Sequence, residues 1–206
     1  MRGSVPKPQE VFSAKLTDKG EMMMRKNILV VTGSPRKHGN SAAMADAFMR
    51  GAQEAGHKLE RFDMAFHHIA GCTACDRCWD DGRACCIKDD WQEFSDKLEH
   101  ADVVVFAYPL YWSTMPAQIK AAIDRLYSYC SAKTIRPLTG KEVVLLLCGE
   151  CEGQQIFRES LSIHEGINQY FDWKTVGTVT VDGVFECGAI QKTDALSRAE
   201  EIGATL

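Results

Sequence analysis

The chain has 206 residues, of which 45% are hydrophobic and 25% are charged, and its formal net charge is -4 at pH 7. This length suffices for one sizeable hydrophobic core and argues against two full domains. The mildly acidic composition offers no basic face of the kind that binds nucleic acid. No apolar run is long enough to span a bilayer and no secretory signal is evident, so we expect a cytoplasmic protein, away from membranes, with a small-molecule partner.

The first 25 residues differ in composition from the rest of the chain. They mix Lys, Glu, Ser, Pro and Gly without a sustained apolar period. This predicts a mobile N-terminal leader, residues 1–25, ahead of a single domain, residues 26–206. A short helix from Gln9 to Lys15 that packs on the domain is the alternative.

From Asn27 onwards, apolar runs alternate with helical patterns. The expected strands are 28–31, 59–64, 102–107, 143–147 and 175–181, and the expected helices include 41–55, 154–170 and 193–202. A further helix is expected after Pro116, where Ile119, Ala122, Ile123 and Leu126 share one face. Such alternation requires right-handed crossovers and predicts a three-layer, doubly wound α/β fold with a five-stranded parallel sheet. Ligands of such sheets bind beyond the carboxyl ends of the strands, so we expect the site in the loops after Val31, Ala107 and Leu147.

A further helix is expected after Asp90. Asp90 can cap it and Glu93 can reach back, as in a capping box, while Trp91, Phe94 and Leu98 share one face. Asp89 and Asp90 are therefore interpreted as structural rather than catalytic.

The loop after the first strand, residues 33–41, has the features of an anion site. Ser34, Asn40 and Ser41 supply short donors, Gly39 permits close backbone approach, and Arg36 adds a charge with a fork suited to phosphate. Its spacing matches neither the G-x-G-x-x-G dinucleotide turn nor the G-x-x-x-x-G-K-[ST] loop. A terminal monophosphate fits better, and an ordinary polar turn is the alternative.

Two further loops would complete the rim. Tyr111 and Trp112 follow the third strand, where they could cover a planar ring. Their alternative roles are to cap the core or to make a dimer contact. After the fourth strand, Gly149 would let the backbone approach a ligand.

Five of the nine cysteines lie between Cys72 and Cys86. Four of them form the pattern C-x₂-C-x₂-C-x₆-C, a compact set of thiols that could hold one cubane iron-sulfur cluster. Bare thiols in a structured loop and a zinc site are the alternatives.

Three stretches together resemble a known family: G-S-P-R-K-x-G-N-S after the first strand, P-L-Y-W-S-T-M-P-A-Q-I-K-A-A-I-D-R after the third, and a cysteine-rich insertion ending in K-D-D. From Lys26 onwards the chain resembles the flavodoxin-like NADPH-dependent FMN reductases, close to their iron-sulfur flavoprotein branch. The resemblance implies the strand order 2-1-3-4-5, FMN as cofactor, NAD(P)H as a transient co-substrate and a homodimer or higher homo-oligomer.

The resemblance also implies a set of binding residues and no catalytic side chain, because the flavin itself carries the electrons. FMN would be bound by Ser34, Arg36, Gly39, Asn40, Ser41, Pro109, Leu110, Tyr111, Trp112, Ser113, Met115, Cys148 and Gly149. A [4Fe-4S] cluster would be bound by Cys72, Cys75, Cys78 and Cys85, with Cys86 as a neighbour or substitute. We interpret His67, His68 and His164 as solvated or structural.

Three functions follow as hypotheses. The first is an FMN-dependent oxidoreductase that takes electrons from NAD(P)H and passes them to a flavin, a quinone or a similar acceptor. The second is an iron-sulfur flavoprotein for one-electron transfer, fed by a ferredoxin-like donor. The third is a non-enzymatic flavodoxin-like carrier or redox sensor, which the weak acidity of the chain disfavours.

Overall fold

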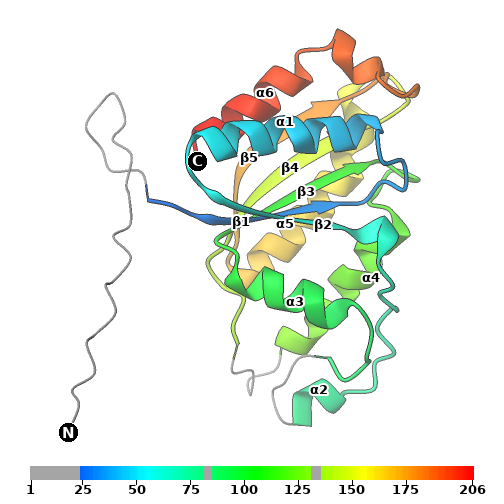
Figure 1. Cartoon of the computed structure of the whole chain (residues 1–206). Helices are drawn as coiled ribbons and strands as arrows, with labels where there is room; N and C mark the ends of the chain where they lie inside the picture. The colour runs from blue at the N-terminus through cyan, green and yellow to red at the C-terminus, as the bar shows by residue number, and fades with distance from the viewer. Residues whose placement is uncertain (1–23, 81–84, 131–135) are drawn as a thin grey trace, which may run out of the picture.

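Five parallel strands form the central sheet of the protein, in the order β2-β1-β3-β4-β5. The structure is a computed structural model that describes residues 24–80, 85–130 and 136–206 (Figure 1). The predicted three-layer α/β fold and its strand order are thereby confirmed. The strands are β1 (Asn27–Thr32), β2 (Lys58–Asp63), β3 (Val103–Pro109), β4 (Glu142–Cys148) and β5 (Lys174–Val181).

Helices cover both faces of the sheet (Figure 1). One face is packed by α1 (Asn40–Glu54) and α6 (Ala195–Ala204), and the other by α3 (Trp91–His100), α4 (Ala117–Arg125) and α5 (Arg158–Phe171). A short α2 (Arg77–Asp80) and the 3-10 turns η1 (Met64–Phe66), η2 (Leu126–Tyr129), η3 (Gln154–Phe157) and η4 (Ala189–Lys192) complete the elements. No helix in these described ranges is long and apolar enough to cross a membrane. Residues 1–23 lie outside the described part, and they include the alternative helix from Gln9 to Lys15 and all but the last two residues of the predicted leader, residues 1–25.

The sheet divides the core into two clusters. Central strand β3 is buried on both faces, so that Val104 and Phe106 pack under α3 to α5 while Val103 and Val105 pack under α1 and α6. Burial on both faces explains why its sequence is a continuous apolar run. Edge strand β2 is half-exposed and carries the charged residues Lys58, Glu60 and Arg61.

The predicted capping of α3 by Asp90 is wrong by one residue. Asp89 Oδ1 accepts the N–H of Trp91 at 3.0 Å, and Gln92 Oε1 accepts the N–H of Asp89 at 3.1 Å. The reciprocal pattern of a capping box is therefore made by Asp89 and Gln92. Asp90 instead accepts the N–H of His68 at 2.7 Å, because its carboxylate turns toward the preceding loop.

Arg125, the last residue of α4, is fully buried and ties down both ends of the cysteine-rich segment. Its NH1 donates to both carboxylate oxygens of Asp89, at 2.7 and 2.6 Å, and to the carbonyl of Ala70 at 3.3 Å. Its NH2 donates to the carbonyl of Ile87 at 3.0 Å. Burial acts to raise the pKa of Asp89, but the N–H of Ala70 and the guanidinium of Arg125 outweigh it and hold that pKa below its usual range.

A buried polar group lies behind the end of β3. The hydroxyl of Tyr108 is 2.8 Å from Nε2 of His164 and 2.7 Å from Oγ of Ser160, both on α5. Burial lowers the pKa of His164 to about 4, so the imidazole is neutral in the folded protein. His164 is therefore a structural residue, as the sequence predicts.

This buried imidazole predicts a loss of stability in acid. In the unfolded chain a histidine takes up its proton near pH 6.5, whereas His164 in the folded chain does so only near pH 4. Between these two pH values the unfolded state binds more protons than the folded state. The contribution of His164 to the free energy of unfolding therefore falls by up to about 1.4 kcal/mol per pH unit as the pH drops. Denaturant unfolding from pH 7 to 4 measures the slope of the free energy of unfolding against pH. This slope should be smaller in His164→Gln than in wild type, and equal slopes for the two proteins would contradict the prediction.

Candidate functional site

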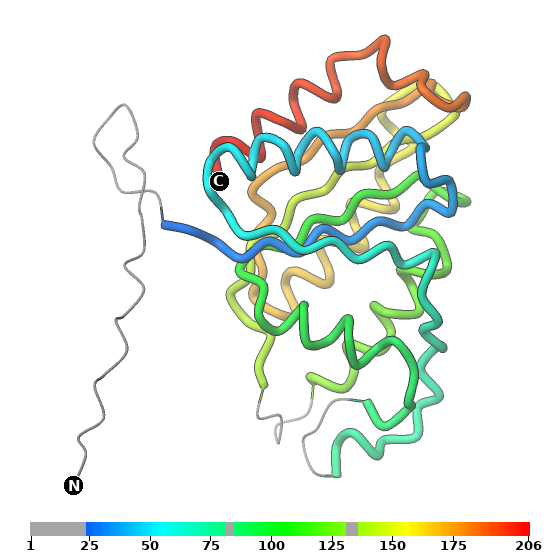
Figure 2. The backbone as a smooth tube through the Cα atoms, viewed as in Figure 1, coloured from blue at the N-terminus to red at the C-terminus, as the bar shows by residue number. Residues whose placement is uncertain are grey.

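The loops after β1, β3 and β4 meet at one end of the sheet (Figure 2). They line a cavity of about 310 Å³. Its lining comprises Ser34, Arg36, Gly39, Asn40, Ser41, Pro109, Leu110, Tyr111, Trp112, Cys148 and Gly149, together with Glu150, Val184 and Phe185. All predicted FMN-binding residues except Ser113 and Met115 are thus brought together at this cavity.

The phosphate loop, residues 33–41, folds back on itself before α1 begins. Ser34 Oγ accepts the N–H of Arg36 at 3.1 Å, and the N–H of Gly39 donates to the carbonyl of Arg36 at 3.0 Å. These bonds hold Arg36 at the tip of a tight turn. Because Gly39 caps α1 without a side-chain hydrogen bond, the first turn of the helix is open to an external acceptor.

Ser41 carries the clearest sign of a missing ligand. The residue is 1% exposed, and its Oγ has no hydrogen-bond partner in the described part of the chain. A buried hydroxyl without a partner is costly, and such groups are normally satisfied by a ligand or a water. An anion at the start of α1 would satisfy it.

Asn40 has a second use in this loop. Its Nδ2 donates to the carbonyl of Glu186 at 3.0 Å, and its Oδ1 accepts the N–H groups of Gly188 and Ile190 at 3.2 and 3.3 Å. The side chain therefore fastens the segment after β5 to the start of α1. A phosphate here would meet the backbone of Asn40 more readily than its amide group.

The aromatic loop after β3 contains a tight turn with an unusual backbone. Tyr111 and Thr114 exchange N–H to carbonyl bonds of 2.9 and 3.1 Å, and the two residues between them, Trp112 and Ser113, have φ angles of 50° and 66°. Such left-handed geometry disfavours bulky residues and is found most often at functional sites. It holds Trp112 99% exposed at the mouth of the cavity.

Met115 and Ser113 do not line the cavity, although the family resemblance implies that they bind the flavin ring. Met115 is 4% exposed and packs in the core cluster with Ile119 and Ala122, because it precedes Pro116 at the start of α4 and turns inward. Ser113 is exposed beside Trp112 and lies outside the lining of the cavity.

The third loop contributes backbone rather than a reactive thiol. Cys148 is buried under α1, and burial raises the pKa of its thiol to about 12, partly offset by the N–H of Ser41. Its carbonyl accepts the N–H of Leu110 at 2.8 Å, which joins the second and third loops. A Cβ on Gly149 would lie 2.6 Å from Cδ1 of Ile156, so the small residue lets the chain pack closely here.

A fourth loop, after β5, was missed by the sequence reasoning. It brings Val184 and Phe185 to the cavity, and Arg36 lies over the Phe185 ring at 5.5 Å and 3.4 Å from its carbonyl. The end of β5 lies at the same edge of the sheet as the other strand ends. An aromatic residue between Gly183 and Gly188 was therefore the available signal.

The cysteine-rich segment lies apart from this cavity, around α2. Burial, together with the neighbouring Cys85, Cys75 and Cys72, raises the pKa of Cys78 to about 11. The sulfurs of Cys75 and Cys86 lie 3.8 Å apart. Among the described residues, no three His, Cys, Asp or Glu side chains are arranged as a metal site.

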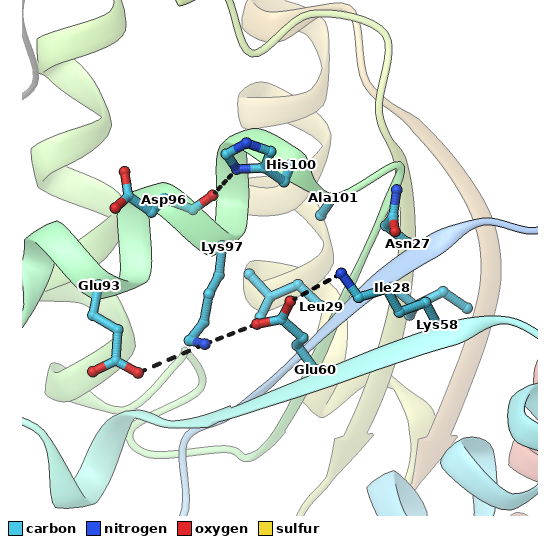
Figure 3. Close-up of a pocket in the computed structure, with 10 residues that line it drawn as sticks. All are labelled: Asn27, Ile28, Leu29, Lys58, Glu60, Glu93, Asp96, Lys97, His100 and Ala101. Atoms are coloured by element: carbon cyan, nitrogen blue, oxygen red, sulfur yellow. Dashed lines mark hydrogen bonds and ion pairs between the residues drawn. The ribbon is translucent and has the colours of Figure 1, made fainter. Parts of the chain in front are cut away.

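A larger cavity, of about 620 Å³, lies between α3 and the β1–β2 edge of the sheet. Figure 3 shows Lys97 reaching between Glu93 and Glu60, and its ammonium is 3.7 and 2.8 Å from their carboxylates. Lys58 is 3.8 Å from the other oxygen of Glu60. The cations of this cavity are thus already paired with carboxylates, and it shares no lining residue with the cavity at the strand ends.

Comparison with known proteins agrees with the class that the fold and the cavity define, a flavodoxin-like α/β domain with an anion loop after its first strand. The family model of the NADPH-dependent FMN reductases matches residues 26–182, and the chain belongs to this family. The predicted resemblance is therefore confirmed.

Among curated proteins, the chain is 33% identical over 115 residues to an iron-sulfur flavoprotein of Archaeoglobus fulgidus, covering 56% of this chain and 52% of that protein. It is 36% identical over 95 residues to an iron-sulfur flavoprotein of Methanosarcina thermophila, covering 46% and 49%. The chain spans about half the length of these curated relatives.

Among solved structures, an NAD(P)H:quinone oxidoreductase from Methanothermobacter marburgensis has a TM-score of 0.69 at 23% identity, covering 88% of this chain and 96% of that one. An FMN-dependent NADH-azoreductase from Bacillus anthracis str. Ames Ancestor, in complex with FMN, has a TM-score of 0.60 at 12% identity, covering 87% and 98%. At these identities the likeness shows the fold.

Proposed function

We propose that the chain binds FMN in the cavity at the strand ends and uses it to pass electrons from NAD(P)H to a small-molecule acceptor such as a flavin or a quinone. The observation that carries the proposal is the unpartnered, buried Oγ of Ser41 beside Arg36, at one end of a cavity whose other end is the aromatic loop. A ligand with a phosphate at one end and a flat ring at the other fits both ends. Membership of the FMN reductase family supports the same cofactor.

Each part of the cavity has a separate task in this proposal. The hydroxyl of Ser41 and the first turn of α1 donate hydrogen bonds to the phosphate, while Arg36 neutralises part of its charge. The backbone of Leu110 and Gly149 borders the ring, and Tyr111 covers its flank. When bound here, FMN would supply the hydride and electron chemistry, for which these residues provide the position and the surroundings.

The test of this activity is a turnover assay with FMN-loaded protein. NADPH or NADH is mixed with a soluble benzoquinone, and absorbance at the nicotinamide band is followed with and without the protein. We expect oxidation of the nicotinamide that requires both FMN and acceptor. FMN-loaded protein that is not reduced by either nucleotide would refute the enzymatic part and favour a carrier or redox sensor.

Replacing Arg36 by alanine should weaken FMN binding by about 10- to 100-fold, since a hydrogen bond to a charged group contributes about 1.5–3 kcal/mol. Arg50→Ala is the matched control, because Arg50 lies on α1 and pairs with Glu200 away from the cavity. Flavin fluorescence titration of the flavin-free proteins measures both. Equal dissociation constants for the Arg36 and Arg50 variants would contradict the assignment.

A second candidate function is one-electron transfer through an iron-sulfur cluster held by Cys72, Cys75, Cys78 and Cys85. The compact C-x₂-C-x₂-C-x₆-C spacing of these residues favours it, and thiols are the donors that such clusters use. The two curated relatives named above are iron-sulfur flavoproteins. In this form we propose a ferredoxin-like donor, and for either form a cytoplasmic homodimer or higher homo-oligomer.

Iron and sulfide analysis of protein purified without oxygen tests the second candidate. We expect about four iron atoms per chain, as in one [4Fe-4S] cluster, and loss of most of the iron in Cys78→Ser. Cys187→Ser is the control, since this exposed cysteine lies at the phosphate loop, where its thiol donates to the carbonyl of His38. Bound zinc, or no metal at all, would refute the cluster and leave the flavin proposal intact.

A further inference from the structure

A second cavity, of about 430 Å³, lies on the other side of the phosphate loop. It opens at the carboxyl ends of β1 and β2. It shares Ser34 and Arg36 with the proposed flavin cavity at the ends of β1, β3 and β4, which is called the first cavity below. The two cavities therefore flank one anion-binding loop. A ligand in the second cavity would lie next to the phosphate of a flavin in the first.

Positive charge is available at this second cavity. Arg61 is already neutralised, because its Nε donates to Asp63 at 2.8 Å and its NH1 to Asp46 at 2.5 Å. Arg36 and Lys37 are in no ion pair recorded for the described ranges. These two cations would attract a phosphate group from this side.

An exposed aromatic ring stands beside the cations. Phe66 is 50% exposed, and Nζ of Lys37 lies 5.2 Å from the centre of its ring. The arrangement mirrors the first cavity, where Phe185 is also 50% exposed and Arg36 lies over it. A flat ring flanked by a cation is a stacking surface for a nucleobase.

Asp63 supplies an acceptor at the end of β2. Both of its recorded side-chain hydrogen bonds go to Oδ1, from Oγ1 of Thr32 at 2.5 Å and from Nε of Arg61 at 2.8 Å. These bonds fix the carboxylate and leave Oδ2 to face other donors. The hydroxyls of a ribose are suitable donors, and an acidic residue near a strand end has this role in other nucleotide-binding sheets.

We propose that the second cavity binds an adenosine phosphate, with the phosphate at Arg36 and Lys37, the ribose at Asp63 and the adenine on Phe66. The proposal rests on the proposed flavin site, which provides the neighbouring phosphate. Two molecules carry this chemistry. One is FAD, whose adenylyl half would extend from the first cavity into the second, and the other is the adenosine end of NADPH.

The experiment compares wild type with Phe66→Ala and Lys37→Ala. Flavin-free protein is titrated with FMN and with FAD by flavin fluorescence, and FMN-loaded protein is assayed for its KM for NADPH with a quinone. AMP is added as a competitor of FAD. Phe185→Ala is the matched control, because it removes an equally exposed ring beside the same loop but on the first cavity.

We expect both variants to bind FMN within about twofold of wild type, which also shows that they are folded. If FAD is the ligand, its dissociation constant rises about tenfold in Phe66→Ala, as loss of one base stack predicts, and AMP competes with FAD in wild type. If NADPH is the ligand, its KM rises about tenfold instead while FAD binding is unchanged. Phe185→Ala should weaken FMN and FAD alike.

The proposal is overturned if neither FAD binding nor the KM for NADPH changes in the two variants. Failure of the flavin site itself would look different, because FMN would then not bind to wild type. Binding of AMP to flavin-free wild type, and its loss in Phe66→Ala, would support the second cavity even in that case.

Discussion

Replacing Arg125 by methionine should lower the free energy of unfolding by about 3–5 kcal/mol, the usual cost of removing one partner of a buried ion pair. Both side chains of the pair are almost fully buried, with 0% exposed for Arg125 and 4% for Asp89. The variant leaves the carboxylate of Asp89 buried without its partner, and it also removes the bonds to Ala70 and Ile87. Urea unfolding followed by circular dichroism measures the change.

Two further variants separate the buried charge from other effects. Lys120→Met removes an exposed ion pair of the same helix, 2.5 Å from Asp124, and should cost less than about 1 kcal/mol. Adding Asp89→Asn to Arg125→Met should recover part of the loss, because the unpaired charge disappears. Stability of Arg125→Met within about 1 kcal/mol of wild type would contradict the role of this pair.

Gly203→Ala is expected to cost about 3 kcal/mol or more, at the upper end of overpacking substitutions. Gly203 on α6 faces α1, and a Cβ there would lie 2.2 Å from the carbonyl oxygen of Phe48 and 2.8 Å from the N of Ala52. Both contacts are with backbone, which cannot turn aside as a side chain can. The two helices would have to separate, so we expect a lower midpoint of thermal unfolding.

Gly166→Ala on α5 is the matched control. A Cβ at Gly166 would meet nothing within 4 Å, so the substitution adds no clash. Alanine is the better helix former by about 1 kcal/mol, and this variant should therefore be slightly more stable than wild type. Midpoints that shift in the same direction in Gly203→Ala and Gly166→Ala would contradict a close contact between α6 and α1 at Gly203.

The architecture could be predicted from the sequence because burial is encoded locally. The continuous apolar run of β3 and the glycine-rich turn between β1 and α1 each specify one element, and alternation then leaves few topologies. The loops after β1, β3 and β4 line one cavity, as the sequence predicts, because ligands of parallel sheets bind beyond the carboxyl ends of the strands.

The missed details depend on contacts between segments far apart in the chain. The sequence predicts Asn40 as a phosphate donor. In the fold, its amide group is instead bonded to the segment near Gly188, almost 150 residues away. The sequence predicts a structural role for Asp89, but it does not indicate that Arg125 is its partner. Such choices of partner are decided by tertiary packing, which local spacing does not record.

Equilibrium titration of flavin-free protein with FMN tests whether the cavity between the phosphate loop and the aromatic loop binds this cofactor. We predict saturable binding of one FMN per chain, with a visible flavin spectrum that stays with the protein through gel filtration. Arg36→Ala should need a higher FMN concentration to reach the same saturation. A folded wild-type protein that takes up no FMN would show that this cavity is not a flavin site.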